Sequence, residues 1–242
     1  MGQYYRGVVL GKTTKKSQKI IVKQSFCCYA HDNGAKLMEH SYVGNWYVKE
    51  YEYALANQFY GYPFVWSGDY ADDKYNTSVY EQALTFIKKQ TTKNARSMGY
   101  RKVKNPKWFK EYVKNGEYAS DSDMGVKIPY EELITTTSTY KYIINLDKKV
   151  FVRIPEKKGV DENGNYQLTI HPLPLLCADG NQRGGGDYYG TNETLVGSWA
   201  YDRIGVSDEL PEGITTELVV TFEESWGDTS KKGDNYKYVE HK

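Results

Sequence analysis

The sequence predicts an α+β fold: a single domain with an antiparallel or mixed sheet, a long amphipathic helix packed on one face, and a basic helical insertion. Runs rich in β-branched and aromatic residues, separated by turn signals, occur near both ends of the chain. Between residues 35 and 59, apolar and small residues instead recur every three or four positions, which is typical of a helix. A chain of 242 residues can bury one large core. We therefore expect one domain over 1–226 and a polar tail over 227–242.

The N-terminal third predicts a hairpin followed by the long helix. Residues 4–10 and 20–29 have the composition of two strands. Gly44 lies inside the helical stretch 35–59, where glycine costs about 1 kcal/mol relative to alanine. We expect either close packing at Gly44 or a break in the helix. The helical spacing is carried by Leu37, Ser41, Gly44, Val48, Tyr51 and Leu55.

The remaining elements follow from similar signals. Residues 62–67 predict a short buried strand, and the capping pattern at Ser78 predicts a helix of two to three turns that ends at Lys88 and Lys89. Asn105 and Pro106 mark the start of another short helix. Hairpin strands are expected at 140–146 and 150–154, and further strands at 195–200 and 216–222.

Composition indicates the cellular compartment in which the protein is expected. No run of about 20 apolar residues occurs, and the opening residues lack the apolar core of a signal peptide. The three cysteines are an odd number without zinc-site spacing. We expect a cytoplasmic protein without a membrane span or cofactor. The 24 tyrosines against 7 phenylalanines suit half-buried strands or a recognition surface.

Charge is unevenly distributed along the chain. The segment 88–114 holds ten basic residues and one acid, a net charge of +9, so the rest of the chain carries −8 of the total of +1. We place this basic segment within an insertion and loop over 88–125. A nucleic acid or an acidic protein surface is the expected partner. Lysine and arginine interleaved with aromatic rings is the chemistry of sequence-tolerant nucleic-acid binding, whereas the same aromatic rings can also anchor a helix to the core. The candidate contact residues are Lys93, Arg96, Arg101, Lys102, Lys104, Lys107, Trp108 and Lys110.

The passage 171–190 is the strongest local candidate for a site. A proline-rich apolar stretch leads into three consecutive glycines, which favour positive φ or close approach of the backbone to another group. The passage lacks the lysine and hydroxyl residue of a Walker loop and the dinucleotide fingerprint. Backbone N–H groups and an arginine can hold an anion here, or the loop can be a tight structural connection. The candidate ligand-binding residues are Arg183, Gly184, Gly185, Gly186, Asp187 and Tyr188.

Candidate catalytic residues are few. His40 lies near Lys36 on the expected helix, Asp69 follows an expected strand, and Asp187 belongs to the glycine-rich passage. A structural histidine and turn-forming aspartates explain the same residues. His171, before a proline, is a second candidate base with the same structural alternative. Asp69, Asp72 and Asp187 have the chemistry for Mg²⁺, but no metal-binding spacing supports this, and we predict no metal site.

Several passages resemble a family of uncharacterised proteins from bacteria and their phages. They are the opening Met1–Tyr5, residues 33–45, 66–72 and 145–149, the His171–Gly190 passage with its Arg-Gly-Gly-Gly-Asp motif, and residues 197–203. The resemblance covers most of the chain outside about 88–130. It implies a prokaryotic or phage setting, with a host cytoplasm as the location if a phage encodes the protein, and it implies no activity.

These observations leave three hypotheses of function. The first is a non-enzymatic interaction protein, such as a phage-encoded modulator of a host machine, that binds nucleic acid or another polyanion through 88–114. The second is a nucleotide- or phosphoester-processing enzyme, which requires His40, Asp69, Asp72, Arg183 and Asp187 to converge. The third is a structural component of a larger assembly. The first hypothesis is preferred, because the sequence contains no activated nucleophile or defined metal set.

Overall fold

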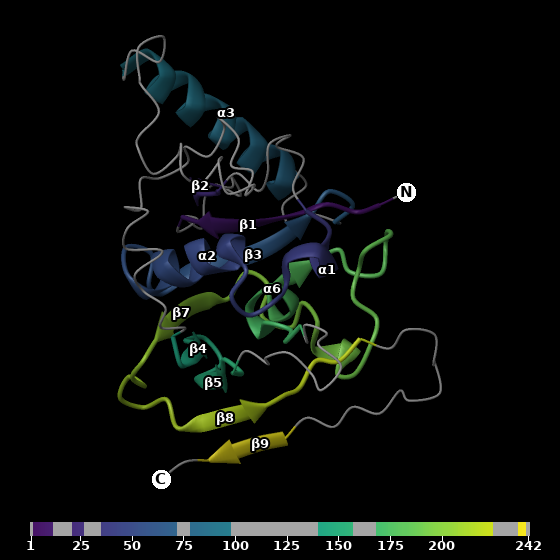
Figure 1. Cartoon of the computed structure of the whole chain (residues 1–242). Coiled ribbons are helices and arrows are strands. Elements are labelled where there is room, and N and C mark those ends of the chain that lie inside the picture. Colours follow the sequence, from purple (N-terminus) through teal and green to yellow (C-terminus); the bar gives the residue numbers. More distant parts are fainter. Residues whose placement is uncertain are drawn as a thin grey trace, which may run out of the picture.

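A computed structural model describes residues 2–11, 21–26, 35–71, 78–97, 140–156, 168–224 and 237–240. It has the predicted α+β architecture, with a mixed sheet of nine strands and helices packed on it (Figure 1). The strands are β1 Tyr5–Leu10, β2 Val22–Gln24, β3 Tyr62–Gly68, β4 Tyr142–Asn145, β5 Val150–Arg153, β6 Ala178–Asp179, β7 Arg203–Ser207, β8 Thr216–Val219 and β9 Lys237–Glu240. The helices are α1 Leu37–His40, α2 Trp46–Ala56, α3 Val79–Ser97, α6 Pro172–Leu176 and the 3₁₀ turn η2 Glu193–Leu195. Within the described ranges, no helix combines the length and apolarity that crossing a bilayer requires.

The sheet is mostly antiparallel. Its strand order is β2-β1-β3-β7-β4-β5-β8-β9, with β6 beside the end of β3. Among the strand pairs in the described part of the chain, β3–β6 and β5–β8 are parallel and the others are antiparallel. The two predicted hairpins are present as β1–β2 and β4–β5. Strand β9, from the polar segment 227–242, pairs with β8 at one edge of the sheet.

The single helix predicted over 35–59 is wrong, because the chain forms two helices there. Helix α1 ends at His40 and α2 begins at Trp46. Gly44 between them has a φ of +88°, which a continuing helix does not allow. Asn45 then caps α2, with its side-chain oxygen accepting from the backbone N–H of Tyr47 at 2.9 Å. The apolar residues therefore keep a helical spacing in the sequence although a turn separates α1 from α2. They are buried on the same side of the chain.

Two further elements differ from expectation. The helix that begins near Ser78 is not two to three turns long but extends through 19 residues to Ser97. The strand predicted over 195–200 is wrong: the chain forms η2 followed by turns. Gly197 there has a φ of +79°, and its N–H donates to the carbonyl of Leu175 at 2.8 Å, so this apolar run packs as a turn against α6.

Helices α2 and α3 cover opposite faces of β1 and β3 (Figure 1). All six residues of β1 are buried, because both of its faces are covered. Tyr5 and Val9 belong to the large core on the α2 side. Val8 and Leu10 instead pack with Val79 of α3. This arrangement gives β1 the continuous buried pattern that is expected of a strand between two layers.

The core on the α2 side is rich in aromatic rings. Tyr51 contacts Phe26, Phe64 and Trp66 with ring centroids 4.7 to 5.4 Å apart. Its hydroxyl donates to the carbonyl of Gly7 at 2.5 Å, and a Cβ on Gly7 would lie 2.5 Å from the ring. The glycine in β1 therefore lets the tyrosine ring lie directly on the strand. Tyr51 and Tyr188 are core tyrosines whose hydroxyls donate to backbone carbonyls.

Candidate functional site

The glycine-rich loop after β6 lies against the N-terminal segment and the start of α1. A Cβ on Gly184 would come within 2.5 Å of the Gln3 side chain, and one on Gly186 would come within 2.4 Å of Lys36. Gly186 also has a φ of +87°. The carbonyl of Gly185 accepts from the N–H of Gln3 at 3.0 Å. Close backbone approach, one of the two predicted reasons for these glycines, is therefore satisfied by the chain itself.

Asp187 closes this loop from inside. It is 5% exposed, and its Oδ2 accepts from the N–H groups of Arg183 and Gly184 at 2.7 and 3.0 Å. Its Oδ1 accepts from the hydroxyl of Tyr5 at 3.0 Å. Three donors thus hold the carboxylate in place, as in a structural turn. The Asp187 carboxylate positions the loop rather than facing solvent.

The other candidate ligand-binding side chains are also engaged within the protein. Arg183 is exposed, and its Nη1 donates to the carbonyl of Tyr70 at 3.0 Å. Tyr188 is buried, and its hydroxyl donates to the carbonyl of Thr191 at 2.6 Å. Burial raises the pKa of Tyr188 to about 12. The Arg183 contact joins the glycine-rich loop to the turn after β3.

Asp69 and Asp187 lie in the same neighbourhood, around the hydroxyl of Tyr5. Burial is the main cause that raises the pKa of Tyr5, followed by the charge of Asp187, with smaller contributions from Asp179 and Asp69. Asp69 accepts from the N–H of Tyr4 at 3.1 Å. Burial raises the pKa of Asp69, and the charge of Asp187 adds to this effect. Among the described residues, no three acidic, histidine or cysteine side chains are arranged to hold a metal ion, and Asp72 lies outside those residues.

Gln3 is a part of this neighbourhood that sequence reasoning missed. Its side chain is fully buried, and within the described part of the chain neither atom of its amide forms a hydrogen bond. A Cβ on Gly68 or on Gly180 would lie 2.2 or 2.5 Å from its Nε2. The two glycines, the last residue of β3 and the residue after β6, therefore make room for the amide. Gln3 is separated from these glycines by 65 and 177 residues in the sequence, so no local sequence pattern predicts its burial here.

His40 is a core residue. Its side chain has no exposed surface, and its Nε2 accepts from the indole N–H of Trp66 at 2.7 Å, while the two rings stack at 5.3 Å. Burial lowers the pKa of His40 to about 3, against a smaller opposing effect of a backbone hydrogen bond to Lys36. A neutral imidazole in this position holds Trp66 in place and cannot reach a substrate.

His171 is also structural. Its Nδ1 accepts from the N–H of Leu173 at 3.2 Å and thereby caps α6. Its Nε2 lies 2.6 Å from Oε1 of Glu52, and both side chains are buried. Because Nδ1 accepts, the hydrogen of the neutral ring lies on Nε2 and is donated to Glu52. This contact connects α6 to α2.

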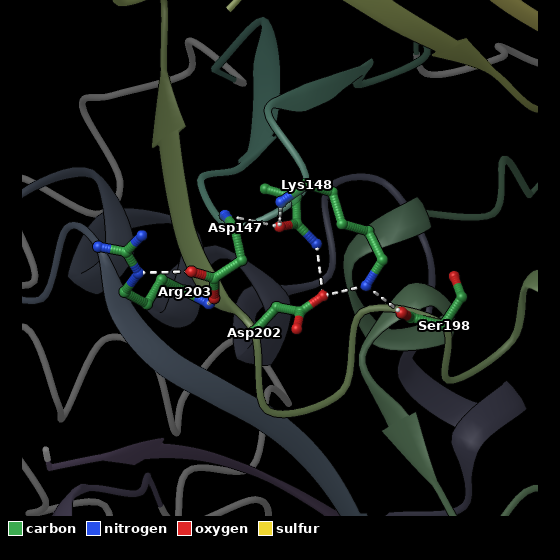
Figure 2. A network of polar contacts seen from close by, with 6 residues as sticks. Asp147, Lys148, Ser198, Asp202 and Arg203 are labelled. Atoms are coloured by element: carbon green, nitrogen blue, oxygen red, sulfur yellow. Dashed lines mark hydrogen bonds and ion pairs between the residues drawn. The ribbon is translucent and has the colours of Figure 1, made fainter.

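A polar network joins the β4–β5 turn to the segment before β7 (Figure 2). Lys148 donates to the carbonyl of Ser198 at 2.9 Å and forms an ion pair with Asp202. Asp147 accepts from Nε of Arg203 at 2.7 Å, and Asn145 donates to Asp202 at 2.8 Å. Figure 2 shows these side chains pointing toward one another from the two segments, so the network fastens the turn to the sheet.

Two of the eight basic-segment candidates for nucleic-acid contact lie in an element that the structure describes. These are Lys93 and Arg96, which belong to α3. The remaining candidates, Arg101, Lys102, Lys104, Lys107, Trp108 and Lys110, lie outside the described residues, as does the short helix predicted to begin near Asn105.

Comparison of the chain with protein-family models, with curated proteins and with solved structures finds no match.

Proposed function

We propose that the chain is a non-enzymatic nucleic-acid-binding protein that uses the basic segment 88–114. The observation that carries this proposal is the charge of +9 within 27 residues of a chain whose remainder is −8. Nucleic-acid affinity is supplied mainly by neutralising phosphates with lysine and arginine. The acidic remainder would orient a polyanion toward this segment and away from the rest of the surface.

The geometry of α3 supports the proposal. Its buried positions Val79, Ala83 and Ile87 follow one another at intervals of four. Residues 89, 93 and 96, all basic, are spaced by four and three, so the helical backbone places them together on a face different from the buried one. From Gln82 to Ser97 the helix contains no acidic residue. Figure 1 shows α3 on the outer side of β1, with its end pointing away from the sheet.

Nucleic acid is preferred over an acidic protein surface because aromatic residues accompany the charges. Tyr100, Trp108, Phe109 and Tyr112 lie between the lysines and arginines of the segment. Aromatic rings stack on bases, and each stacked base contributes about 1–3 kcal/mol without regard to sequence. An acidic protein surface offers the charges but no such stacking partner.

The candidate catalytic residues support a binding role over an enzymatic one. A general base must reach the proton that it abstracts. His40 has no exposed surface, and the carboxylate of Asp187 is held by three donors of its own chain.

The test is a binding titration with a labelled single strand and a labelled duplex, followed by fluorescence anisotropy. The variant carries Lys102→Glu, Lys104→Glu, Lys107→Glu and Lys110→Glu. The matched control carries Lys23→Glu, Lys141→Glu, Lys149→Glu and Lys237→Glu, which changes net charge by the same amount at exposed positions outside the segment.

We expect the first variant to lose affinity at least tenfold and the control to lose much less. Equal losses would show that net charge alone acts, and absence of binding by the native protein to both oligonucleotides would overturn the proposal. If the native protein binds neither oligonucleotide but binds an acidic protein, the segment would be assigned to a protein partner.

A further inference from the structure

Helix α3 rests on a small apolar core. The buried cluster between α3 and the sheet contains Val8, Leu10, Val65, Val79 and Ala83. On the opposite face, the cluster that includes α2 also extends to α6 and to β7. Since apolar burial supplies most of the free energy of packing, the described contacts hold α3 less firmly than α2.

Polar side chains interrupt the α3 face of the sheet. Arg6 of β1 is paired with Ser67 of β3, and Ser67 is paired with Asp179 of β6, so the three residues form a row across three neighbouring strands. Arg6 and Ser67 are fully buried. Their side chains face α3 because Val8 and Val65, two positions away on the same strands, pack against it.

Burial of this row is costly for docking. The hydroxyl of Ser67 forms no hydrogen bond within the described residues. The guanidinium of Arg6 lies 5.4 Å from the ring centroid of Tyr80 on α3, and Asp179 accepts from the hydroxyl of Tyr201. A buried hydroxyl without a partner reduces the gain from covering the surface around it.

We propose that α3 is a separately opening layer, which leaves the sheet as a unit while the α2 side stays folded. Contiguous units of low local stability open in this way below the free energy of global unfolding. The inference rests on packing alone and does not depend on the proposed nucleic-acid binding. Its consequence is that the helix carrying the first basic residues changes position relative to the sheet under native conditions.

The test is native-state hydrogen exchange of the full chain, with two matched variants. Val79 on α3 and Val48 on α2 are both buried in the N-terminal half of their helix, at 0% and 1% exposure. Val79→Ala weakens contacts that are lost both when α3 opens and when the whole chain unfolds, so it is expected to speed exchange in α3 by about tenfold or more and exchange in α2 and β4 by no more than the same factor. Val48→Ala weakens contacts that the α3-open state keeps, so it is expected to speed exchange in α2 and β4, which requires global unfolding, and to leave exchange in α3 unchanged.

A third variant, Ser67→Ala, removes the hydroxyl without a partner and is expected to slow exchange in α3. The proposal is overturned if Val48→Ala speeds exchange in α3 as much as in α2. It is also overturned if Val79→Ala prevents folding, or if α3 and α2 of the native protein exchange through openings of equal free energy.

Discussion

The two faces of β1 and β3 differ in how they are packed. On the α2 face, aromatic rings fill the space, the hydroxyl of Tyr51 bonds to backbone groups, and Nε2 of His40 accepts from Trp66. On the α3 face, a few aliphatic side chains surround Arg6 and the hydroxyl of Ser67. The comparison teaches that one sheet can support a rigid layer and a loosely held one, and that in this chain the basic residues begin on the loosely held layer.

Replacing Trp66 tests the aromatic face and has the largest expected effect. Trp66→Ala removes a fully buried ring that contacts Tyr47, Tyr51 and Phe64 and donates to His40. We expect a loss of about 3–5 kcal/mol in the free energy of unfolding, measured with urea. Should Val79→Ala cost as much, the two faces would not differ as described.

Acid should also destabilise the aromatic face through His40. The pKa of His40 falls from its ordinary value of 6.5 to about 3 in the folded protein, so between these values only the unfolded chain binds the proton. Stability is therefore lost as pH falls from 6.5 toward 3, by on the order of 5 kcal/mol at most for this group. Because carboxylates titrate in the same window, the measurement is the pH slope of unfolding relative to His40→Gln. Equal slopes for the two proteins would contradict the role given to burial of the imidazole.

Glycine substitutions extend the comparison to the loop beside the α2 face. Gly213→Ala changes a position with a φ of +80° and open space around it, so it measures the backbone cost alone, about 1–2 kcal/mol. Gly186→Ala adds overlap with the Lys36 side chain to a similar φ. We expect the second variant to lose more stability in thermal unfolding. Equal losses would indicate that the loop is not packed against Lys36.

The polar network of Figure 2 should contribute least. The side chain of Lys148 is 44% exposed, and solvent weakens its ion pair with Asp202. We expect Lys148→Met to cost less than about 1 kcal/mol in urea unfolding. A loss comparable to that of Trp66→Ala would mean that this turn, and not the aromatic face, organises the sheet.

Local signals predicted the hairpins but not the helix break. The β4–β5 hairpin follows from two strand-forming runs around a polar turn, information that lies within about 15 residues. In 35–59 the apolar spacing is helical throughout, and Gly44 alone indicated the turn that divides α1 from α2. The strand prediction for 195–200 was wrong because the glycine and aromatic residues of this run pack onto α6 instead of pairing with a strand.

The candidate site was predictable only in part. The glycines, Asp187 and its neighbour Asp69 were identified as a group from composition and loop position, and the structure brings them together. Gln3 was missed because its surroundings come from the ends of β3 and β6. Burial of His40 depends on Trp66, which is 26 residues away, and no helical periodicity contains that information.

Salt dependence of nucleic-acid binding tests the central claim most directly, namely that a basic helix face on the α3 layer contacts phosphates. The variant Lys89→Gln, Lys93→Gln, Arg96→Gln is compared with the control Lys23→Gln, Lys141→Gln, Lys149→Gln. The slope of log affinity against log salt is negative, and each lost phosphate contact reduces its magnitude by about 0.9 on duplex DNA. The account predicts a slope smaller in magnitude by roughly 2–3 for the α3 variant and little change for the control. Identical slopes for the native protein and the α3 variant would contradict it.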